Sequence, residues 1–345
     1  MRAVVYRGPG QVVIEEVPEP VPSPDRVLVR VRAAGVCQTD VHIRRGHDHR
    51  AVSGLVLGHE IAGTVEAAPD GSPWAHGTPV AVYPMWACGR CPACVAGRRQ
   101  ACVGTGGRTV TPPTPGVSAP GGMADLVSVP ESALAGADGL DPAVAAVLAD
   151  AVLTPYSSIR AAQPHLSPGA VALVVGVGGL GSTAVAVLRA TTAATVVAVD
   201  LNPAALAAVA DLAHHTLAAD APDVAGRILE LTGGAGVDVV LDFVGAAATL
   251  ELAAATVAPF GAVRVTGMSE GELTLHCGAG SRFPRGVSVT ERTFSGSRTE
   301  FDEVLGLAAS GTVVPTVTRH PLDDAVAVLD ALERGEVRGR AVLTL

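Results

Sequence analysis

Residues 170–190 read AVALVVGVGGLGSTAVAVLRA and decide the fold of the second half of the chain. An apolar run leads into a glycine-rich turn, and apolar residues at helical spacing follow it. Residues 195–200, TVVAVD, repeat the apolar run, and the alternation of apolar runs and helical patterns continues to residue 267. Fully apolar strands that alternate with helices are typical of a parallel sheet covered on both faces. We therefore predict an α/β domain here.

The glycine-rich turn, GVGGLG, is a candidate dinucleotide site. Gly176, Gly178 and Gly181 stand directly between strand and helix, where backbone N–H groups can approach a pyrophosphate at a helix N-terminus. Asp200 closes the next strand 24 residues after Gly176, so it is placed to accept hydrogen bonds from the adenosine ribose hydroxyls. The two residues after Asp200 supply no arginine for a 2′-phosphate, which favours NAD(H) over NADP(H). The alternative is a tight turn with a solvent-exposed aspartate.

The first half of the chain is predicted to be rich in β-structure. Residues 1–34 and 55–85 alternate apolar and polar side chains, which indicates antiparallel strands. Residues 103–122 are rich in Gly, Pro and Thr and are predicted to form an exposed loop. Residues 141–163 carry a proline in their first turn and apolar residues at helical spacing, which predicts a helix.

The composition limits the possible functions. The 345 residues are 48% hydrophobic and carry a net charge of −9, so two domains with sizeable cores are expected and nucleic acid is excluded as a partner. The apolar runs are broken by Gly or Pro and the N-terminus lacks an apolar signal region, so we expect a cytoplasmic protein without a membrane partner. All 24 basic residues are arginine, which excludes Schiff-base chemistry on a lysine.

Residues 35–60, GVCQTDVHIRRGHDHRAVSGLVLGHE, carry side chains suited to a metal site. The Cys37 thiolate and the His59 imidazole are good zinc ligands, and the chain must fold back to bring them together. The hydroxyl of Thr39, two residues after the cysteine, could pass on a proton. Asp150 interrupts an apolar stretch. Such a carboxylate alone is more often a cap or a polar core residue, but beside an incomplete Cys/His site it is the best candidate for a third ligand.

A second metal site is predicted in residues 88–102, CGRCPACVAGRRQAC. Four cysteines with C-x2-C-x2-C-x7-C spacing fit a closed tetrahedral zinc site; they are Cys88, Cys91, Cys94 and Cys102. The alternatives are a redox CxxC pair and an iron–sulfur cluster. With all four positions filled by protein, this zinc would be structural.

These motifs occur in one order over nearly the whole chain: GVCQTDVH, GHEIAGTV, the four-cysteine loop, GVGGLG and VRGRAVL. They resemble the zinc-dependent alcohol dehydrogenases of the medium-chain dehydrogenase/reductase superfamily, with an aspartate ligand as in the bacterial secondary-alcohol branch. The resemblance implies an α/β chain with a GroES-like β domain at residues 1–150, an inserted NAD-binding Rossmann domain at 151–295, and a return to the catalytic domain at 296–345. It also implies about two zinc ions per subunit, NAD(H), and homodimers or homotetramers.

The resemblance assigns site residues position by position. The catalytic zinc ligands are matched by Cys37, His59 and Asp150. The residues that act around this zinc are matched by Thr39 and His42 as a proton relay, Asp40 as the partner of the ligand histidine, and Glu60 as a carboxylate that visits the metal. The cofactor-binding positions are matched by Gly176, Gly178, Gly179, Leu180, Gly181, Asp200, Thr154, Phe243, Val244, Thr266, Gly267 and Arg340.

The implied function is hydride transfer between NAD(H) and an alcohol/carbonyl pair, either a secondary alcohol and its ketone or an aldehyde. The nearest alternative is an NAD(P)H-dependent biosynthetic reductase of a C=N, C=C or unusual carbonyl substrate on the same fold. Residues 293–300, TFSGSRTE, keep this alternative open because relatives commonly have a longer segment there. A non-catalytic protein that kept the fold would lack ligands such as Cys37 and Asp150.

Two further features concern the substrate side. Residues 46–55 depart from the pattern of relatives, and we expect His47 and His49 in that segment to be solvent-exposed loop residues. The aromatic candidates for a pocket wall are Trp86, Tyr156 and Phe294, of which Trp86 is the strongest because it directly precedes the cysteine loop. The alternative for Trp86 is a core or loop position.

Overall fold

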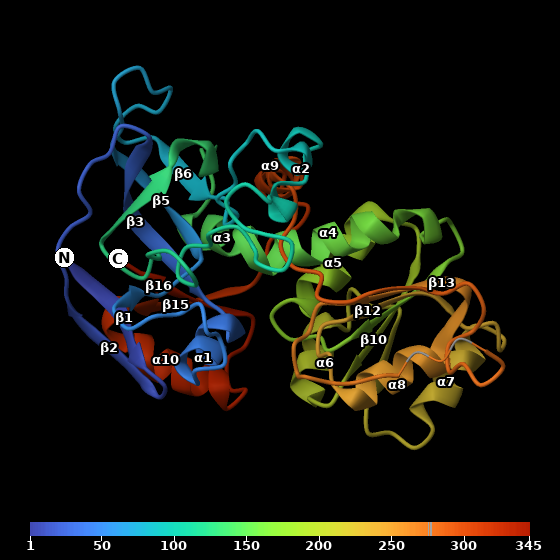
Figure 1. Ribbon diagram of the computed structural model, residues 1–345. Coiled ribbons are helices and arrows are strands. Elements are labelled where there is room, and N and C mark those ends of the chain that lie inside the picture. The colour runs from blue at the N-terminus through green and yellow to red at the C-terminus, as the bar shows by residue number, and fades with distance from the viewer. Residues whose placement is uncertain (275, 277) are drawn as a thin grey trace. The chain divides into compact units, whose positions relative to one another are not determined.

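The computed structural model describes residues 1–274, 276 and 278–345, so Cys277 lies outside the described part of the chain. The chain forms two compact units (Figure 1). The first unit combines Met1–Leu153 with Ser295–Leu345, and the second is Thr154–Phe294. The C-terminal stretch joins the first unit because β16 (Arg340–Thr344) pairs antiparallel with β3 (Arg26–Val36).

The first unit is built on a seven-stranded sheet with the order β15-β16-β3-β5-β6-β8, in which β7 also pairs with β3. All of these pairs are antiparallel except β15 with β16. The other strands of this sheet are β5 (Glu60–Ala67), β6 (Pro79–Val82), β7 (Leu126–Pro130), β8 (Leu134–Gly136) and β15 (Val317–Pro321). A smaller sheet has the order β2-β1-β4, formed by β1 (Arg2–Gly8), β2 (Gln11–Glu16) and β4 (Leu55–Val56).

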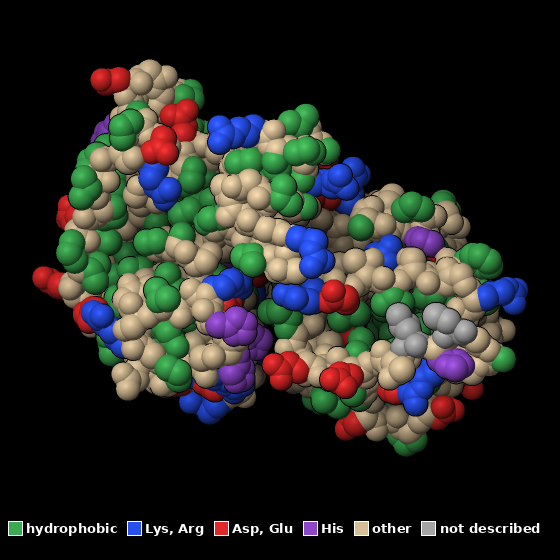
Figure 2. Space-filling model, viewed as in Figure 1, with side chains coloured by type: hydrophobic (Ala, Val, Ile, Leu, Met, Phe, Trp, Pro, Cys, Tyr) green, Lys and Arg blue, Asp and Glu red, His purple; other side chains and the backbone are tan. Residues whose placement is uncertain are grey.

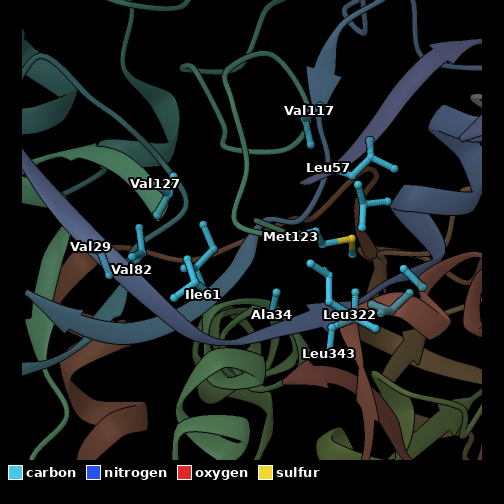
Figure 3. Packing of buried hydrophobic residues seen from close by; sticks show 14 of the residues in the cluster. Val29, Ala34, Leu57, Ile61, Val82, Val117, Met123, Val127, Leu322 and Leu343 are labelled. Carbon is cyan, nitrogen blue, oxygen red and sulfur yellow. The ribbon is translucent and has the colours of Figure 1, made fainter. Parts of the chain in front are cut away.

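The alternating sequence pattern produces the core of this unit. Val27, Val29 and Val31 of β3 are buried, and the residues between them are more exposed, because successive side chains of a strand point to opposite faces. Figure 3 shows Ile61 and Val82 from neighbouring strands packed into the same core. Ile61 is fully buried, and truncation of such a side chain to alanine costs about 2–5 kcal/mol.

Five α-helices accompany these sheets among the described residues: α1 (Gln38–Arg44), α2 (Pro92–Val95), α3 (Pro142–Val147), α9 (Arg298–Ala309) and α10 (Ala325–Glu333). The sequence explains the start of α3, because Pro142 occupies its first turn and the Asp141 carboxylate accepts hydrogen bonds from Ala143 N–H at 2.9 Å and Val144 N–H at 3.3 Å.

The predicted helix at 141–163 is divided by a π-helical segment, Leu148–Val152, before α4 (Leu153–Ala162). Such segments are rare and are often found at functional sites. Within the described residues, Pro142–His165 alone is long and apolar enough to cross a membrane by length and composition. However, 78% of its apolar window is buried inside the protein, as in a core helix.

The second unit has a six-stranded parallel sheet with the order β11-β10-β9-β12-β13-β14. Its strands are β9 (Val171–Val175), β10 (Thr195–Asp200), β11 (His215–Ala218), β12 (Val237–Asp242), β13 (Val257–Val265) and β14 (Ser288–Thr290). Numbered along this unit, the order is 3-2-1-4-5-6, the order of a doubly wound dinucleotide-binding sheet. The prediction of a parallel α/β domain is therefore confirmed.

Helices cover this sheet in the expected alternation: α5 (Gly181–Thr191), α6 (Pro203–Val209), α7 (Val224–Leu231) and α8 (Ala247–Thr256). Ile228 of α7 and Ala253 of α8 pack with Leu173 and Val175 of β9 in one buried cluster. The central strands β9, β10 and β12 are buried on both faces, which is why they appear in the sequence as unbroken apolar runs.

Candidate metal centres and active site

Three elements of the first unit bring together the predicted catalytic ligands. Cys37 follows β3 and forms the N-cap of α1, His59 directly precedes β5, and Asp150 lies in the π-helical segment. Donor atoms of Cys37, His59, Glu60 and Asp150 all lie within 4.8 Å of one another. The three side chains predicted as ligands therefore meet in one cluster, in which Cys37 and His59 are buried and Asp150 is partly exposed.

The distances in this cluster, the donor cluster, fit a tetrahedral metal ion. Cys37 Sγ is 3.3 Å from Asp150 Oδ2, and His59 Nε2 is 3.7 Å from the same oxygen. Ligands at tetrahedral zinc bond lengths are about 3.3–3.8 Å from one another. A thiolate, an imidazole and a carboxylate are also the donor types that zinc prefers. The residues present therefore fit a zinc ion.

The electrostatics of the donor cluster also favour a cation. Burial by itself lowers the pKa of His59, but the Asp150 carboxylate and the Cys37 sulfur outweigh it and raise that pKa well above its usual value. Asp40 is fully buried, with Oδ1 4.0 Å from His59 Nδ1. Its Oδ2 accepts a hydrogen bond from Cys37 N–H at 2.9 Å. Asp40 is thus in position to orient the imidazole of His59.

Glu60 and Arg340 form a buried ion pair beside this cluster. Arg340 donates to the Glu60 carboxylate, and its guanidinium lies 3.9 Å from Asp150 Oδ2. Burial raises the pKa of Glu60, and the Arg340 charge opposes that rise. Gly35 leaves the space for this carboxylate, because a Cβ there would lie 1.8 Å from Glu60 Oε2. No local sequence pattern indicates this pairing, and the assignment of Arg340 to cofactor binding stays a prediction.

Helix α1 places two further residues near the donor cluster. Thr39 Oγ1 is 3.8 Å from Cys37 Sγ, and His42 follows Thr39 by three residues, which puts both on one face of the helix. Both side chains are partly exposed. Arg44 at the end of the helix donates to Asp330 at 2.6 Å and to Glu333, both on α10. The helix that carries Thr39 and His42 is therefore fastened to the core of the unit.

The four-cysteine loop forms a second donor set within the first unit. The sulfurs of Cys88, Cys91, Cys94 and Cys102 lie within 4.8 Å of one another, with Cys91 Sγ 3.5 Å from Cys94 Sγ and 3.9 Å from Cys102 Sγ. Tetrahedral zinc–sulfur geometry places sulfurs about 3.8 Å apart. The backbone N–H of Cys94 lowers the pKa of Cys91, which favours the thiolate that binds metal. These residues also fit a zinc ion.

In the second unit, the turn between β9 and α5 has the geometry that its glycines predict. Gly176 adopts φ +79°, and a Cβ at Gly181 would lie 1.8 Å from the Gly176 carbonyl oxygen. A Cβ at Gly178 would have open space around it. Asp200 Oδ2 accepts a hydrogen bond from Val177 N–H at 2.7 Å, and its Oδ1 accepts one from Asn202 N–H at 2.7 Å. The carboxylate is therefore held at the turn, and the open surface at Gly178 fits a pyrophosphate.

The other predicted cofactor residues of this unit lie mainly at the carboxyl ends of β12 and β13. The backbones of Val244 and Gly267 touch there, since a Cβ on Gly267 would lie 2.0 Å from the Val244 carbonyl carbon. Thr266 shares a hydrogen bond of 2.6 Å with Thr293. Phe243 directly follows β12, and Thr154 is buried in the first turn of α4. The carboxyl ends of parallel strands are where ligands of such sheets bind.

The aromatic candidates for a pocket wall lie in different surroundings. Trp86 is 7% exposed, belongs to the main core cluster of the first unit, and has the Arg26 guanidinium 4.8 Å from its ring centroid. Trp86 therefore packs in the core of this unit, and its place in a pocket wall stays a prediction. Tyr156 is buried and Phe294 is 41% exposed in the second unit.

The chain is similar to known proteins along nearly its whole length. The family model of the alcohol dehydrogenase GroES-like domain matches residues 23–138, and that of the zinc-binding dehydrogenases matches residues 179–310. An NAD-dependent alcohol dehydrogenase of Sulfurisphaera tokodaii is 31% identical over 96% of this chain and 95% of its own. D-arabinose 1-dehydrogenase (NADP(+)) of Saccharolobus solfataricus is 30% identical over 96% of this chain and 93% of its own.

Comparison of the fold with solved structures also finds dehydrogenases and reductases. The alcohol dehydrogenase of the hyperthermophilic archaeon Aeropyrum pernix has a TM-score of 0.90 and 33% identity, with 100% of both chains covered. Acetophenone reductase of Geotrichum candidum in complex with NAD has a TM-score of 0.86 and 30% identity, with 100% of this chain and 97% of the other covered.

A GroES-like β unit and a Rossmann-type α/β unit, with two metal-binding sets in the first, define a medium-chain dehydrogenase/reductase of the zinc type. Within that class, the chain belongs to the zinc-dependent alcohol dehydrogenases. It is an NAD(P)-dependent oxidoreductase that acts on small alcohols or carbonyl compounds and uses zinc. The predictions of family, fold class, enzymatic activity and cofactors are confirmed.

Proposed function

We propose that the chain oxidises secondary alcohols to ketones, and reduces the ketones in reverse, with the first unit as the catalytic domain and the second as the NAD-binding domain. The observation that carries this proposal is the donor cluster. Cys37, His59 and Asp150 lie at tetrahedral distances, with the Thr39 hydroxyl beside the cysteine sulfur. The structural likeness to an acetophenone reductase supports a ketone of moderate size as the carbonyl partner.

The proposed roles follow from what each side chain can do. When bound, zinc supplies Lewis acidity toward an oxygen atom and NAD supplies the hydride acceptor. The Thr39 hydroxyl can accept and donate at once, so it takes the proton of the alcohol and passes it toward His42. Asp40 is proposed to orient the His59 imidazole, whose Nδ1 lies 4.0 Å from Asp40 Oδ1. Arg340 neutralises Glu60 and keeps that carboxylate among the donor atoms.

The four-cysteine site is proposed to be structural. Its ligands all come from residues 88–102, and all four are sulfurs. A set of four protein ligands leaves no position for a substrate. Zinc there would stabilise the fold of its loop.

Cofactor choice is proposed to rest on Asp200. Two backbone N–H groups hold its carboxylate at the glycine turn, where it can accept hydrogen bonds from a ribose and would repel a 2′-phosphate. Among the relatives, one is named as NAD-dependent and another as NADP(+)-dependent. We propose that this chain prefers NAD(H).

We further propose a cytoplasmic homodimer or homotetramer. The donor cluster and the cysteine loop both require thiolates, which a reducing compartment preserves. β14 is an edge strand, and its three residues are exposed, so it offers unpaired backbone groups to a second copy. Light scattering on a size-exclusion column would test this, because a monomeric mass would contradict the proposal.

The proposed reaction is tested by following NADH absorbance with a panel of compounds. The panel should include 1-phenylethanol and acetophenone, primary alcohols and aldehydes, and substrates with C=N or C=C bonds. We expect the fastest turnover with secondary alcohols and their ketones, and about two zinc atoms per subunit by elemental analysis. Turnover confined to C=N or C=C substrates would favour the alternative function, a biosynthetic reductase. The short segment 293–300 is the sequence feature that keeps this alternative open.

A further inference from the structure

The chain leaves α1 in a way that places two histidines against each other. Gly46 adopts φ +78°, and its N–H donates to Ile43 C=O at 2.9 Å. The N–H of His47 then reaches back to His42 C=O at 3.0 Å. This pair of bonds is a Schellman motif, which ends a helix by turning the chain back over its last turn. Glycine is favoured at the turning position because φ is positive there.

A Schellman motif brings the side chain after the glycine onto a side chain of the last turn, and both are usually apolar. Here both are imidazoles. The ring centroids of His42 and His47 are 6.3 Å apart, and the ring planes are inclined by 31°. The His42 side chain is partly exposed and the His47 side chain is exposed. Figure 2 shows histidine side chains gathered on the surface over α1 and the loop that follows it.

The neighbouring residues keep this pair in place. The turn at Gly46 packs on the β1–β2 hairpin, since a Cβ on Gly46 would lie 2.8 Å from Pro9 Cγ and Gly10 N–H donates to Arg44 C=O at 2.6 Å. The Asp48 carboxylate next to His47 is engaged by Arg50, with Nη2 2.5 Å from Oδ2. That carboxylate is thus held by an arginine.

We propose that His47 is the outer station of the proton relay and carries the proton from His42 to bulk solvent. The inference rests on the proposed relay through Thr39 and His42. Protonated His42 gives one proton to a bridging water, and that water gives one to a free ring nitrogen of His47. Protonated His47 then releases its proton to water or buffer, both imidazoles return to the neutral form, and no electrons are exchanged. The 6.3 Å between ring centroids leaves room for about one water between the nitrogens.

Four variants of the full-length, zinc-loaded enzyme separate this role from packing. His47→Phe keeps a ring against His42 but cannot carry a proton, whereas His47→Ala removes both ring and proton carrier. His49→Ala removes an exposed histidine of the same loop and is the matched control. His42→Ala interrupts the relay before His47.

The measurement is proton release in a single turnover, followed by stopped flow with a pH-indicator dye in about 1 mM buffer, alongside NADH formation. The substrate is whichever alcohol of the panel the parent enzyme oxidises fastest. We expect both His47 variants to release the proton about 3- to 10-fold more slowly than the parent, less than the loss for a full acid–base group. Added imidazole should restore the rate in both, because a soluble proton carrier replaces the missing ring. His49→Ala should behave like the parent.

The outcomes distinguish this inference from the function on which it rests. Proton release at the parent rate in His47→Phe would overturn the inference, and a defect confined to His47→Ala would show that the ring only packs. Slow release in His42→Ala combined with normal release in both His47 variants would retain the relay and remove its outer station. A parent enzyme that forms no NADH from any alcohol would overturn the proposed function, and the inference with it.

Discussion

The two metal-binding sets of the first unit are assembled in opposite ways. The four cysteines come from one loop of fifteen residues, and two of them are only partly buried. The donor cluster draws on three elements, with Cys37 and Asp150 separated by 113 positions. The buried Glu60 carboxylate lies among its donor atoms, and the buried Asp40 and Arg340 adjoin it. A local site needs only its own loop, whereas a distributed site exists only when the whole unit has folded.

The difference predicts opposite consequences when one ligand is removed from each set. Cys37→Ser should lose one zinc per subunit and reduce turnover by more than about 10⁴-fold, because both the Lewis acid and the acid–base relay are lost. Cys94→Ser should also lose one zinc per subunit, lower the melting temperature, and retain turnover in the fraction that stays folded. Elemental analysis, calorimetry and NADH kinetics on both variants test this. Loss of hydride transfer in a stable, fully folded Cys94→Ser protein would contradict the structural role.

Substitutions of Thr39 test the chemistry at the donor cluster without removing its metal ligands. Thr39→Val keeps nearly the same shape but cannot pass a proton, so turnover should fall by roughly 10²–10⁴-fold. Thr39→Ser should retain most activity. His42→Ala should lose less than Thr39→Val, because water can replace the outer part of the relay. Zinc content and NADH binding should be unchanged in all three variants. Equal turnover of the Val and Ser variants would remove Thr39 from the relay.

Features formed by residues close together in the sequence could be predicted, whereas features formed by distant residues could be predicted only in part. The meeting of the four cysteine sulfurs could be predicted, because these residues and the turn residues between them are adjacent in the chain. The parallel sheet was also predicted, since β9, β10 and β12 are apolar on both faces. The edge strands β11 and β14 were not, because HTLA and SVT are short and mostly exposed and carry no apolar run. These strands are exposed because they lie at the edges of the sheet, and which strands lie at the edges is decided only when the sheet folds.

The distributed site was predicted only in part. Cys37, His59 and Asp150 are unusual enough in their surroundings to be chosen as ligands, although spacing alone could not bring them together. The pairing of Glu60 with Arg340 joins residues 280 positions apart. No local sequence pattern indicates this contact. The contacts of Arg44 with α10, which hold α1 in place, are also long-range and are not indicated by a local pattern. Long-range charge pairs depend on the register of β16 against β3, which the sequence does not show.

Substitutions at the glycine turn of the second unit should change cofactor preference without affecting either metal site. Replacing Asp200 by glycine and Leu201 by arginine removes a repelling charge and adds a phosphate partner. The ratio of kcat/KM for NADP(H) over NAD(H) should rise by roughly 10- to 100-fold, the range for hydrogen bonds to charged groups. Zinc content should not change. A parent enzyme that already prefers NADPH would overturn the argument from Asp200.

The smallest substitution that tests the comparison adds one methyl group beside each metal-binding set. Gly35→Ala places a Cβ 1.8 Å from Glu60 Oε2, and Gly104→Ala places one 2.5 Å from Cys88 Sγ. Each should destabilise the protein by about 1–3 kcal/mol, the usual cost of overpacking a filled site. Thermal unfolding measures this cost, and it is expected to be similar for the two variants.

The other readouts of these two variants should differ, because the displaced groups differ in kind. In Gly35→Ala the methyl group pushes the Glu60 carboxylate away from Arg340 and the donor cluster, so turnover should fall while the zinc of the cysteine loop is retained. In Gly104→Ala it pushes the Cys88 sulfur out of its set, so one zinc should be lost with little change in turnover. Gly306→Ala, which adds a methyl group in α9 with no heavy atom outside the adjacent helix backbone within 4 Å of its Cβ, is the control for an added methyl group without crowding. If Gly104→Ala lost turnover as steeply as Gly35→Ala, the local site would not be independent of the distributed one. The cysteine loop would then have to be regarded as part of the machinery that holds the donor cluster in place.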